Sequence, residues 1–149
     1  MTVRQKPRPE RVLHMADVLN KLGHSRAQNL LLRLATRDPR LAQALRLVMF
    51  RFADLVQVRD RSFQVLYAAI ERDTWLLAMR SAPDAIRTKL LANLSVRARA
   101  MFTDDLDTMS KQRRSDVEQA QAQIVATALR LEREGKVYID RPGAPEVYV

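Results

Sequence analysis

The chain lacks cysteine and has only three glycines, and each shortage removes a class of function. Without cysteine there can be no disulfide framework, no thiolate nucleophile and no zinc knuckle. The glycines, Gly23, Gly135 and Gly143, are isolated from one another, which excludes a Gly-rich phosphate-binding loop. Apolar runs such as residues 65–70 are far too short to cross a bilayer. The basic start has no apolar signal core, which predicts a cytoplasmic protein.

What the chain does have is a sizeable apolar content and an uneven positive charge. Its 149 residues are 47% hydrophobic, enough to bury a real core and to argue against disorder. The net charge is +9, but residues 1–60 hold 12 basic and five acidic side chains, whereas residues 61–149 hold 14 and 12. Most of the cations are arginines, which suit bidentate contacts. The charge therefore leaves two kinds of partner open, a nucleic acid or an acidic protein.

Helical periodicity runs through the whole chain and predicts an all-α fold. A first helix is expected over residues 10–22, with Gly23 as its stop. Ser25 is expected to cap a second helix, and Asp38-Pro39 signals the start of a third. Three short amphipathic helices with tight turns would form a helical-repeat-like lobe.

A second series of helices is expected after residue 60. The predicted segments span residues 61–71, 74–80, 83–91, 95–108 and 115–134. Asp73 and Ser95 are the expected caps of two of them, and the Ser-Asp-Val-Glu run at 115–118 reads as a capping box for the last. Residues 136–139 are expected to be extended.

Catalysis finds little support in the sequence. His14 and His24 have no serine or carboxylate in a partner arrangement, so neither is expected to act as a base. Asp104 and Asp105 could suggest a metal site, but adjacent helical residues point about 100° apart and do not converge on one ion. The chain is therefore not expected to be an enzyme or to bind a metal, a cofactor or a small-molecule substrate.

The helix expected over residues 95–108 carries an ordered set of charges. At about 100° per residue, Arg97, Asp104 and Thr108 fall in one narrow stripe, which Asp105 borders. Phe102 lies on another arc, the expected core face. A charged row of this kind is most often the solvated face of its helix.

Several motifs together resemble one known family. They are Met-Phe-Arg-Phe at residues 49–52, Asp-Arg-Ser-Phe-Gln at 60–64, Ala-Asp-Val-Leu-Asn at 16–20 and the 115–118 run. In their order along the chain these motifs resemble the C-terminal domain of the flagellar rotor switch protein FliG, from about Glu10 to the chain end. The Met-Phe-Arg-Phe run is similar to the Met-Phe-X-Phe hinge of that family.

The resemblance implies an arrangement of two lobes. It predicts a disordered basic arm at 1–9, an armadillo-like lobe at 10–48, a hinge segment at 49–58 and a six-helix lobe at 59–149. The hinge residues would be Met49, Phe50 and Phe52. A hinge at this point implies that the lobes can change their relative orientation.

The resemblance also gives the charged stripe a role. Carried over by motif, the residues that would face the cytoplasmic loop of the membrane stator are Arg80, Arg97, Asp104, Asp105 and Arg113. The implied function is a rotor module in motility and chemotaxis, contributing to torque generation and direction switching. Its implied location is the inner face of the cell membrane, at the flagellar basal body.

The chain departs from the family pattern in ways that raise the question of partners. It has no counterpart of the family's N-terminal and middle domains, so it is either a fragment or a short paralogue that is recruited differently. Leu30, Leu34, Leu41 and Leu45 are candidates for an uncovered apolar face. That face would bind the middle domain of a full-length subunit or a second copy of the chain. Alternatively, these leucines form the core of their own lobe.

Two other functions stay open at this stage. One is an arginine-rich helical module that binds nucleic acid, favoured by the basic first lobe. The other is an adaptor that keeps the FliG-like fold but serves a different assembly.

Overall fold

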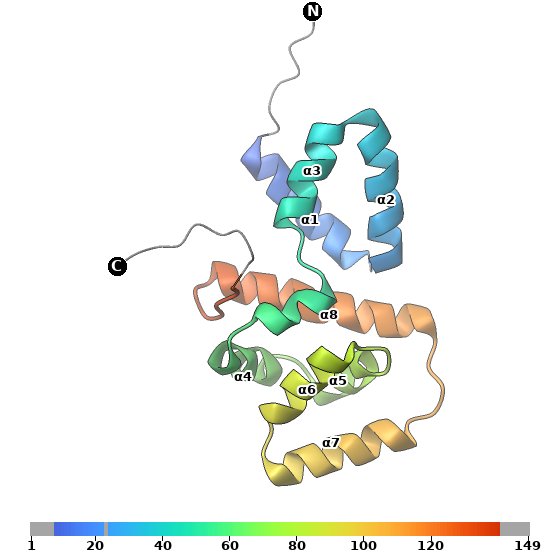
Figure 1. The fold of residues 1–149 in the computed structure, drawn as a ribbon, viewed down its shortest axis with the longest axis vertical. Coiled ribbons are helices and arrows are strands. Elements are labelled where there is room, and N and C mark those ends of the chain that lie inside the picture. The colour runs from blue at the N-terminus through green and yellow to red at the C-terminus, as the bar shows by residue number, and fades with distance from the viewer. Residues whose placement is uncertain (1–7, 23, 141–149) are drawn as a thin grey trace, which may run out of the picture.

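A computed structural model of the chain describes residues 8–22 and 24–140. The fold of these residues is all-helical, as the sequence predicts, and their only β feature is one isolated antiparallel bridge between Val58 and Ile139. Most of the predicted arm at 1–9, together with Gly23, lies outside the described residues. The helices form two lobes, one above the other in Figure 1.

The first lobe consists of α1 (Pro9–Lys21), α2 (His24–Arg37) and α3 (Pro39–Val48). Asp38 caps α3 as predicted, because its carboxylate accepts a hydrogen bond from the backbone N–H of Leu41 at 3.2 Å. Ser25 was the wrong choice of cap for α2, since α2 starts before it, at His24. The core of this lobe contains only aliphatic side chains, from Val12, Ala16, Leu19, Ala27, Leu31 and Leu45.

The four leucines considered for an uncovered face separate into two groups. Leu45 is fully buried, and Leu34 and Leu41 pack half-buried against the same core. Leu30 alone of the four is exposed, at 42% of its surface. Three of the four therefore belong to the core of the lobe, and the face proposed from all four does not exist.

The Met-Phe-Arg-Phe motif stands where the two cores meet. Met49 follows α3 and packs against the core of the first lobe, whereas Phe50 is buried in the core of the second. The short 3₁₀ helix η1 (Phe52–Gln57) comes next, and Phe52 packs against the second core. Two consecutive side chains thus anchor the chain in two different cores.

The second lobe is built from five α-helices that follow η1. They are α4 (Asp60–Ala68), α5 (Arg72–Met79), α6 (Asp84–Ala92), α7 (Val96–Thr108) and α8 (Arg114–Arg133). Trp75 is at the centre of this core, with its ring 5.6 Å from the rings of both Phe63 and Tyr67. The indole N–H donates to the carbonyl of Tyr67 at 3.3 Å, which satisfies its only polar atom.

The helix ends confirm some of the predicted signals and correct others. Ser95 caps α7, because its hydroxyl oxygen accepts from the N–H of Ala98 at 3.1 Å. Gly135, with a φ of 74°, ends α8 in the left-handed conformation that glycine adopts without strain. The capping box at 115–118 is wrong, because α8 starts one residue earlier and Arg113 precedes it without a side-chain cap.

Two further boundaries differ from the prediction in the same way. Asp73 does not cap α5, because the helix already includes it and Glu71 is the preceding residue. The helix expected over residues 61–71 spans Asp60–Ala68. In each case a polar residue that could cap a helix lies inside its first turn instead, where an acid is also favourable.

The lobes touch through α1 and α8. Arg133 on α8 forms an ion pair with Asp17 on α1 at 3.1 Å, and the Ser25 hydroxyl donates to the carboxylate of Glu118 at 3.0 Å. A small hollow of about 40 Å³ lies between the two lobes beside Phe50, and Asn20 forms part of its lining. The side-chain amide nitrogen of Asn20 is buried without a hydrogen-bond partner among the described residues. The contact between the lobes is therefore polar at its edges and incompletely packed.

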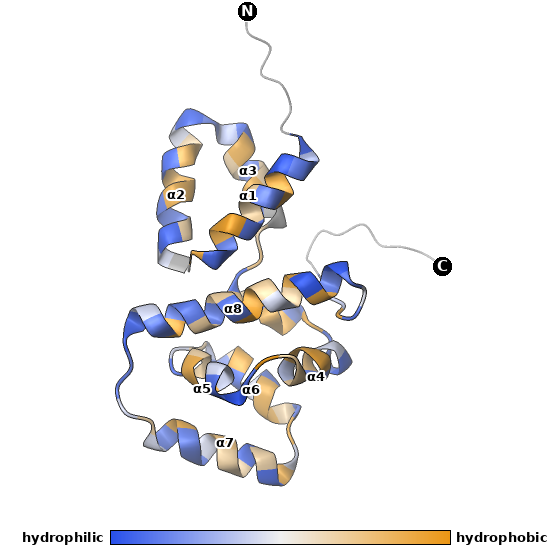
Figure 2. Cartoon of the chain, turned by 180° about the vertical axis from the view of Figure 1, so that it is seen from behind, coloured by the Kyte–Doolittle hydropathy of each residue, from blue (hydrophilic) through white to orange (hydrophobic). Residues whose placement is uncertain are grey.

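Apolar and hydrophilic residues alternate along the helices (Figure 2). Within the described ranges, no helix combines the length and the apolar character needed to span a bilayer.

Candidate partner-binding ridge

The helix α7 is the outermost element of the second lobe, at the end of the molecule opposite the first lobe (Figure 1). Only Phe102 of this helix is fully buried, and Leu106 packs half-buried against the same core. Its main neighbour is α5. Because one aromatic side chain supplies most of the anchorage, the greater part of the surface of α7 faces solvent.

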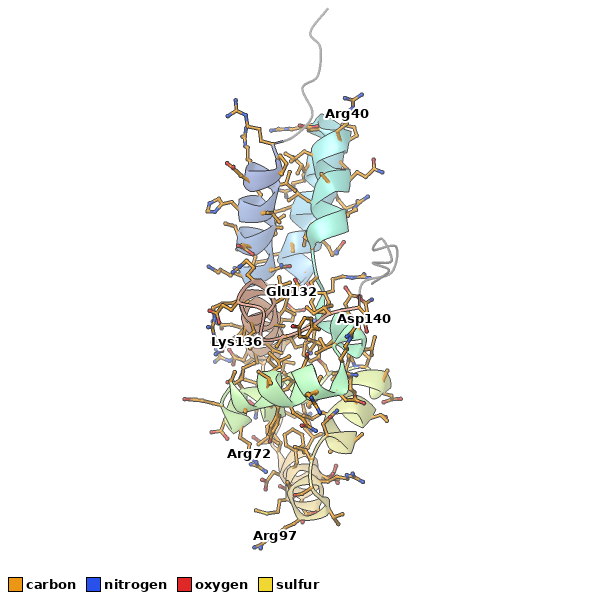
Figure 3. All side chains as sticks on the ribbon, turned by 90° about the vertical axis from the view of Figure 1, so that its left-hand side faces the viewer. Arg40, Arg72, Arg97, Glu132, Lys136 and Asp140 are labelled. Atoms are coloured by element: carbon orange, nitrogen blue, oxygen red, sulfur yellow. The ribbon has the colours of Figure 1, made fainter. Side chains whose placement is uncertain are left out.

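We use the name "ridge" for the five residues that the resemblance singled out, Arg80, Arg97, Asp104, Asp105 and Arg113. All five are exposed. Three of them lie on α7, and Figure 3 shows Arg97 at the tip of the second lobe. The structure thus keeps the charged stripe on an accessible face, as the helical wheel predicts.

The other two ridge residues stand at helix ends. Arg80 follows α5 as its C-cap residue, and Arg113 precedes α8 as its N-cap residue. These two helices pack along each other. The side-chain amide of Gln121 on α8 also donates to the carbonyl of Ala78 at 3.0 Å, close to Arg80. No ion pair joins any two ridge residues in the described part of the chain.

Asp105 has a partner that the sequence did not reveal. Arg72, in the first turn of α5, forms an ion pair with its carboxylate at 2.5 Å. The guanidinium carbon of Arg72 also lies 5.7 Å from the centre of the Phe102 ring, so the arginine contacts the ring that anchors α7. Arg72 thus contacts both Asp105 and the buried ring of α7, whereas Asp104, at the preceding position, has no ion pair among the described residues. Arg72 and Asp105 are 33 positions apart in the sequence, which explains why no sequence pattern indicated the contact.

The order of charges along α7 is the reverse of the order that stabilises a helix. Arginines stand near its N-terminus, at Arg97 and Arg99, and acids stand toward its C-terminus, at Asp104, Asp105 and Asp107. The helix dipole favours acids at the N-terminus and bases at the C-terminus, by about 0.3–1 kcal/mol per exposed charge. Helix stability therefore does not account for this arrangement.

A second set of charged contacts involves Arg59 and Asp60 at the start of α4, and one of them reaches Asp140, the last of the described residues. Asp140 accepts a bidentate contact from Arg59, at 3.0–3.2 Å, and these hydrogen bonds lower the pKa of the carboxyl group. Hydrogen bonds from Lys89 and Asn93 lower the pKa of Asp60. The Arg59–Asp140 contact and the Val58–Ile139 bridge hold the residues predicted to be extended, 136–139, next to η1, whereas the contacts of Asp60 join α4 to α6.

The described residues contain no group of side chains that could hold a metal ion. His14 is exposed on α1. In residues 8–22 and 24–140, no three histidine or acidic side chains come together in a group that could hold a metal ion.

Comparison with protein families assigns the fold. A model of the FliG C-terminal domain matches residues 33–139, which include the Met-Phe-Arg-Phe motif and almost all of the second lobe. The chain belongs to this family. Flagellar motor switch proteins named FliG are similar in sequence, with 33% identity to the protein from Thermotoga maritima over 132 residues. The FliG of Pseudomonas aeruginosa is 32% identical over 136 residues.

Solved FliG structures have the same arrangement of helices. A FliG fragment from H. pylori superimposes with a TM-score of 0.68 at 26% identity, covering 83% of this chain and 58% of that one. The full-length FliG of Aquifex aeolicus gives a TM-score of 0.59 at 29% identity, and 39% of it is covered. The matches cover 89% of this chain but only 39% of the T. maritima protein. This chain therefore spans about two fifths of the length of such relatives.

Proposed function

We propose that this chain is a flagellar rotor and switch module whose ridge engages the cytoplasmic loop of the membrane stator. The observation that carries the proposal is the charge order of α7. Three acids and two arginines are exposed on this helix in an order that opposes its dipole. Asp105 pairs with Arg72, and Arg99 donates to the carbonyl of Leu91. The side chains of Arg97, Asp104 and Asp107 have no partner among the described residues, which leaves these three for a binding partner. The stator is the partner that the family resemblance implies, and the similarity to flagellar motor switch proteins supports that resemblance.

The expected contact is electrostatic rather than tightly bound. Opposite charges on an accessible surface steer a partner and fix its register more than they add affinity. Each exposed pair contributes at most about 1 kcal/mol. Weak contacts of this kind suit a surface that has to engage and release a stator repeatedly, and so contribute to torque generation and switching.

The Met-Phe-Arg-Phe motif is proposed to act as the hinge. Met49 packs in one core and Phe50 in the other, so a change of backbone angle between them would turn one lobe against the other while both cores stay intact. The incompletely packed contact between α1 and α8 supports this proposal, because a hollow of about 40 Å³ remains between the lobes beside Phe50.

Other rotor subunits are the second proposed partner. Beyond Leu30, the exposed apolar side chains of the first lobe include Leu13 at 56% and Leu32 at 61%. They would contact the middle domain of a full-length subunit or a second copy of the chain, placing the module at the basal body on the inner face of the membrane. Light scattering at high protein concentration separates these two cases, since a monomer excludes self-association.

The test of the ridge uses two arginines in matched positions. Arg97 is the second residue of α7 and Arg61 the second residue of α4, and both are exposed. Arg97→Glu together with Asp104→Lys should strongly reduce swimming in the source organism. Arg61→Glu should not, although it changes the charge at an equivalent helix position. Unchanged swimming in the Arg97→Glu and Asp104→Lys variant would contradict the proposal.

A further inference from the structure

The first lobe carries a second charged surface, on the outer side of α2. Arg26, Leu30, Arg33 and Arg37 follow one another at steps of four, three and four residues, which places them within about 60° of one another around the helix. At 1.5 Å per residue they extend over about 16 Å. All four side chains are exposed. We call these four residues the arginine stripe.

The arginines of the stripe have no acidic partner within the described chain. Helix α2 contains no acidic residue, and no carboxylate of the described residues pairs with Arg26, Arg33 or Arg37. Exposed arginines elsewhere do pair, as Arg59 does with Asp140 and Arg133 with Asp17. Like charges at positions i and i+4, such as Arg33 and Arg37, destabilise a helix. Of the three arginines, only Arg37, in the last turn of α2, is favoured by the helix dipole, so the dipole does not account for Arg26 and Arg33.

The composition of the stripe indicates the chemistry of its ligand. Guanidinium groups form bidentate hydrogen bonds with carboxylates, and arginine is enriched in protein interfaces. Leu30 lies between the arginines with 42% of its surface exposed, which gives a partner an apolar contact within the charged row. An amphipathic segment with acidic side chains on either side of an apolar one complements this pattern.

Nucleic acid and lipid fit the stripe less well. The chain has no aromatic residue before Phe50, so this lobe offers no ring on which a base could stack. One exposed leucine within the stripe provides little apolar area for insertion into a bilayer.

We propose that the arginine stripe docks an acidic amphipathic segment of another protein. This surface is separate from the ridge, because α2 belongs to the lobe at the opposite end of the molecule from α7 (Figure 1). In Figure 3, Arg40, which lies just beyond α2, and Arg97 are at opposite tips. The stripe is thus a charged surface in addition to the ridge, and its three arginines have no role in the function proposed above.

The test measures binding of the full chain to a labelled synthetic helical peptide at low salt. The peptide has glutamates at i, i+7 and i+11 and a leucine at i+4, to match the stripe. Arg26→Glu with Arg33→Glu should weaken binding by about tenfold or more, or about 1.4 kcal/mol. The matched control, Arg8→Glu with Arg11→Glu at the start of α1, changes the net charge equally and should cost no more than about twofold.

Two further variants keep the result interpretable. Arg26→Gln with Arg33→Gln removes the charges with a good helix former, and should reduce affinity several-fold while circular dichroism stays unchanged. Leu30→Ser should also reduce it, because the apolar contact is lost. Equal losses in the stripe variant and in the α1 control would overturn the proposal, since overall charge would then explain binding. Tighter binding to a DNA duplex or to phosphatidylglycerol vesicles than to the peptide would overturn it as well.

Discussion

The two lobes differ in what they bury. The second lobe packs Trp75, Phe63 and Phe102 at its centre, and these large rings bring together helices distant in sequence. The first lobe has an aliphatic core of a few alanine, valine and leucine side chains and no aromatic residue. A small core of this kind supplies limited stability, so the first lobe depends in part on its contact with α8.

The surfaces of the lobes differ as well. Within the second lobe, acids and bases are of nearly equal number and several form ion pairs, such as Arg72 with Asp105. The first lobe, residues 10–48, has seven basic and three acidic side chains, and α2 contains no acid at all. Most of the net charge of +9 therefore comes from the first lobe together with residues 1–9, and it is the arrangement of charges that distinguishes the two surfaces.

Removing the central aromatic residue should have the largest effect. Trp75→Ala deletes a fully buried ring and should lower the free energy of unfolding by about 3–5 kcal/mol, which would unfold the second lobe. Denaturation followed by circular dichroism measures this loss. Trp75→Phe keeps part of the ring volume and should cost clearly less. Equal losses from both variants would mean that the indole hydrogen bond to Tyr67, rather than packing, dominates.

A matching change in the first lobe tests whether the two cores are independent. Leu45→Ala should destabilise its lobe by about 2–4 kcal/mol, because Leu45 is fully buried. Trp75 is the only tryptophan, so its fluorescence reports on the second lobe alone, while circular dichroism reports on both. The fluorescence midpoint should move little and the dichroism curve should become biphasic. A common shift of both signals would show that the lobes unfold as one unit.

A smaller effect is expected from exchanging the charges of the Arg72–Asp105 pair between α5 and α7. This exchange shows whether Asp105 positions α7 or itself contacts the partner. Arg72→Asp leaves Asp105 facing a like charge and should weaken binding of a stator-loop peptide several-fold. Arg72→Asp with Asp105→Arg restores an ion pair in the opposite sense. If Asp105 serves mainly to position α7, the exchange should recover binding. Without recovery, Asp105 itself contacts the partner.

The smallest effect is expected for the Arg59–Asp140 contact, as a change in how stability depends on pH. Hydrogen bonds from Arg59 lower the pKa of Asp140 in the folded chain below its ordinary value of 3.8. The unfolded chain therefore takes up a proton first as the pH falls, so the stability from this contact is present above that value and is lost below it. Asp140→Asn should remove this part of the pH dependence, measured as the denaturation midpoint from neutral pH to about pH 3.

A control variant makes this small effect measurable. Asp107→Asn changes an exposed aspartate that forms no ion pair in the described part of the chain, and it should leave the acid side of the curve unchanged. The effect of Asp140→Asn should be modest, because more than 60% of each side chain of the Arg59–Asp140 pair is exposed. Identical curves for the two aspartate variants would contradict this role of Asp140.

Features that depend on neighbours in the sequence were the most predictable. The Asp38 and Ser95 caps, the Gly135 stop and the exposed stripe at Arg97 and Asp104 follow from local patterns, and the structure confirms them. The cap predicted at Ser25 failed because α2 already starts at His24; the Ser25 hydroxyl instead donates to Glu118 in the other lobe, a contact that no local rule contains.

Contacts between distant segments could not be predicted in this way. The pairing of Arg72 with Asp105 joins helices that the chain brings together only on folding. Leu34 and Leu41 share the periodicity of an exposed apolar face, yet both pack into the lobe. Periodicity identifies the apolar side of a helix, but it does not say whether that side meets its own lobe or a partner.

The most direct measurement of the ridge follows backbone amide chemical shifts of the full chain while the stator cytoplasmic loop is added. Shifts should concentrate on the exposed residues of α7, around Arg97 and Asp104, and near Arg80 and Arg113. They should weaken as salt is added, because exposed charges are screened. Amides of α4 near Arg61 should stay unchanged. Shifts confined to α1–α3, or no shifts at low salt, would contradict a stator-facing ridge.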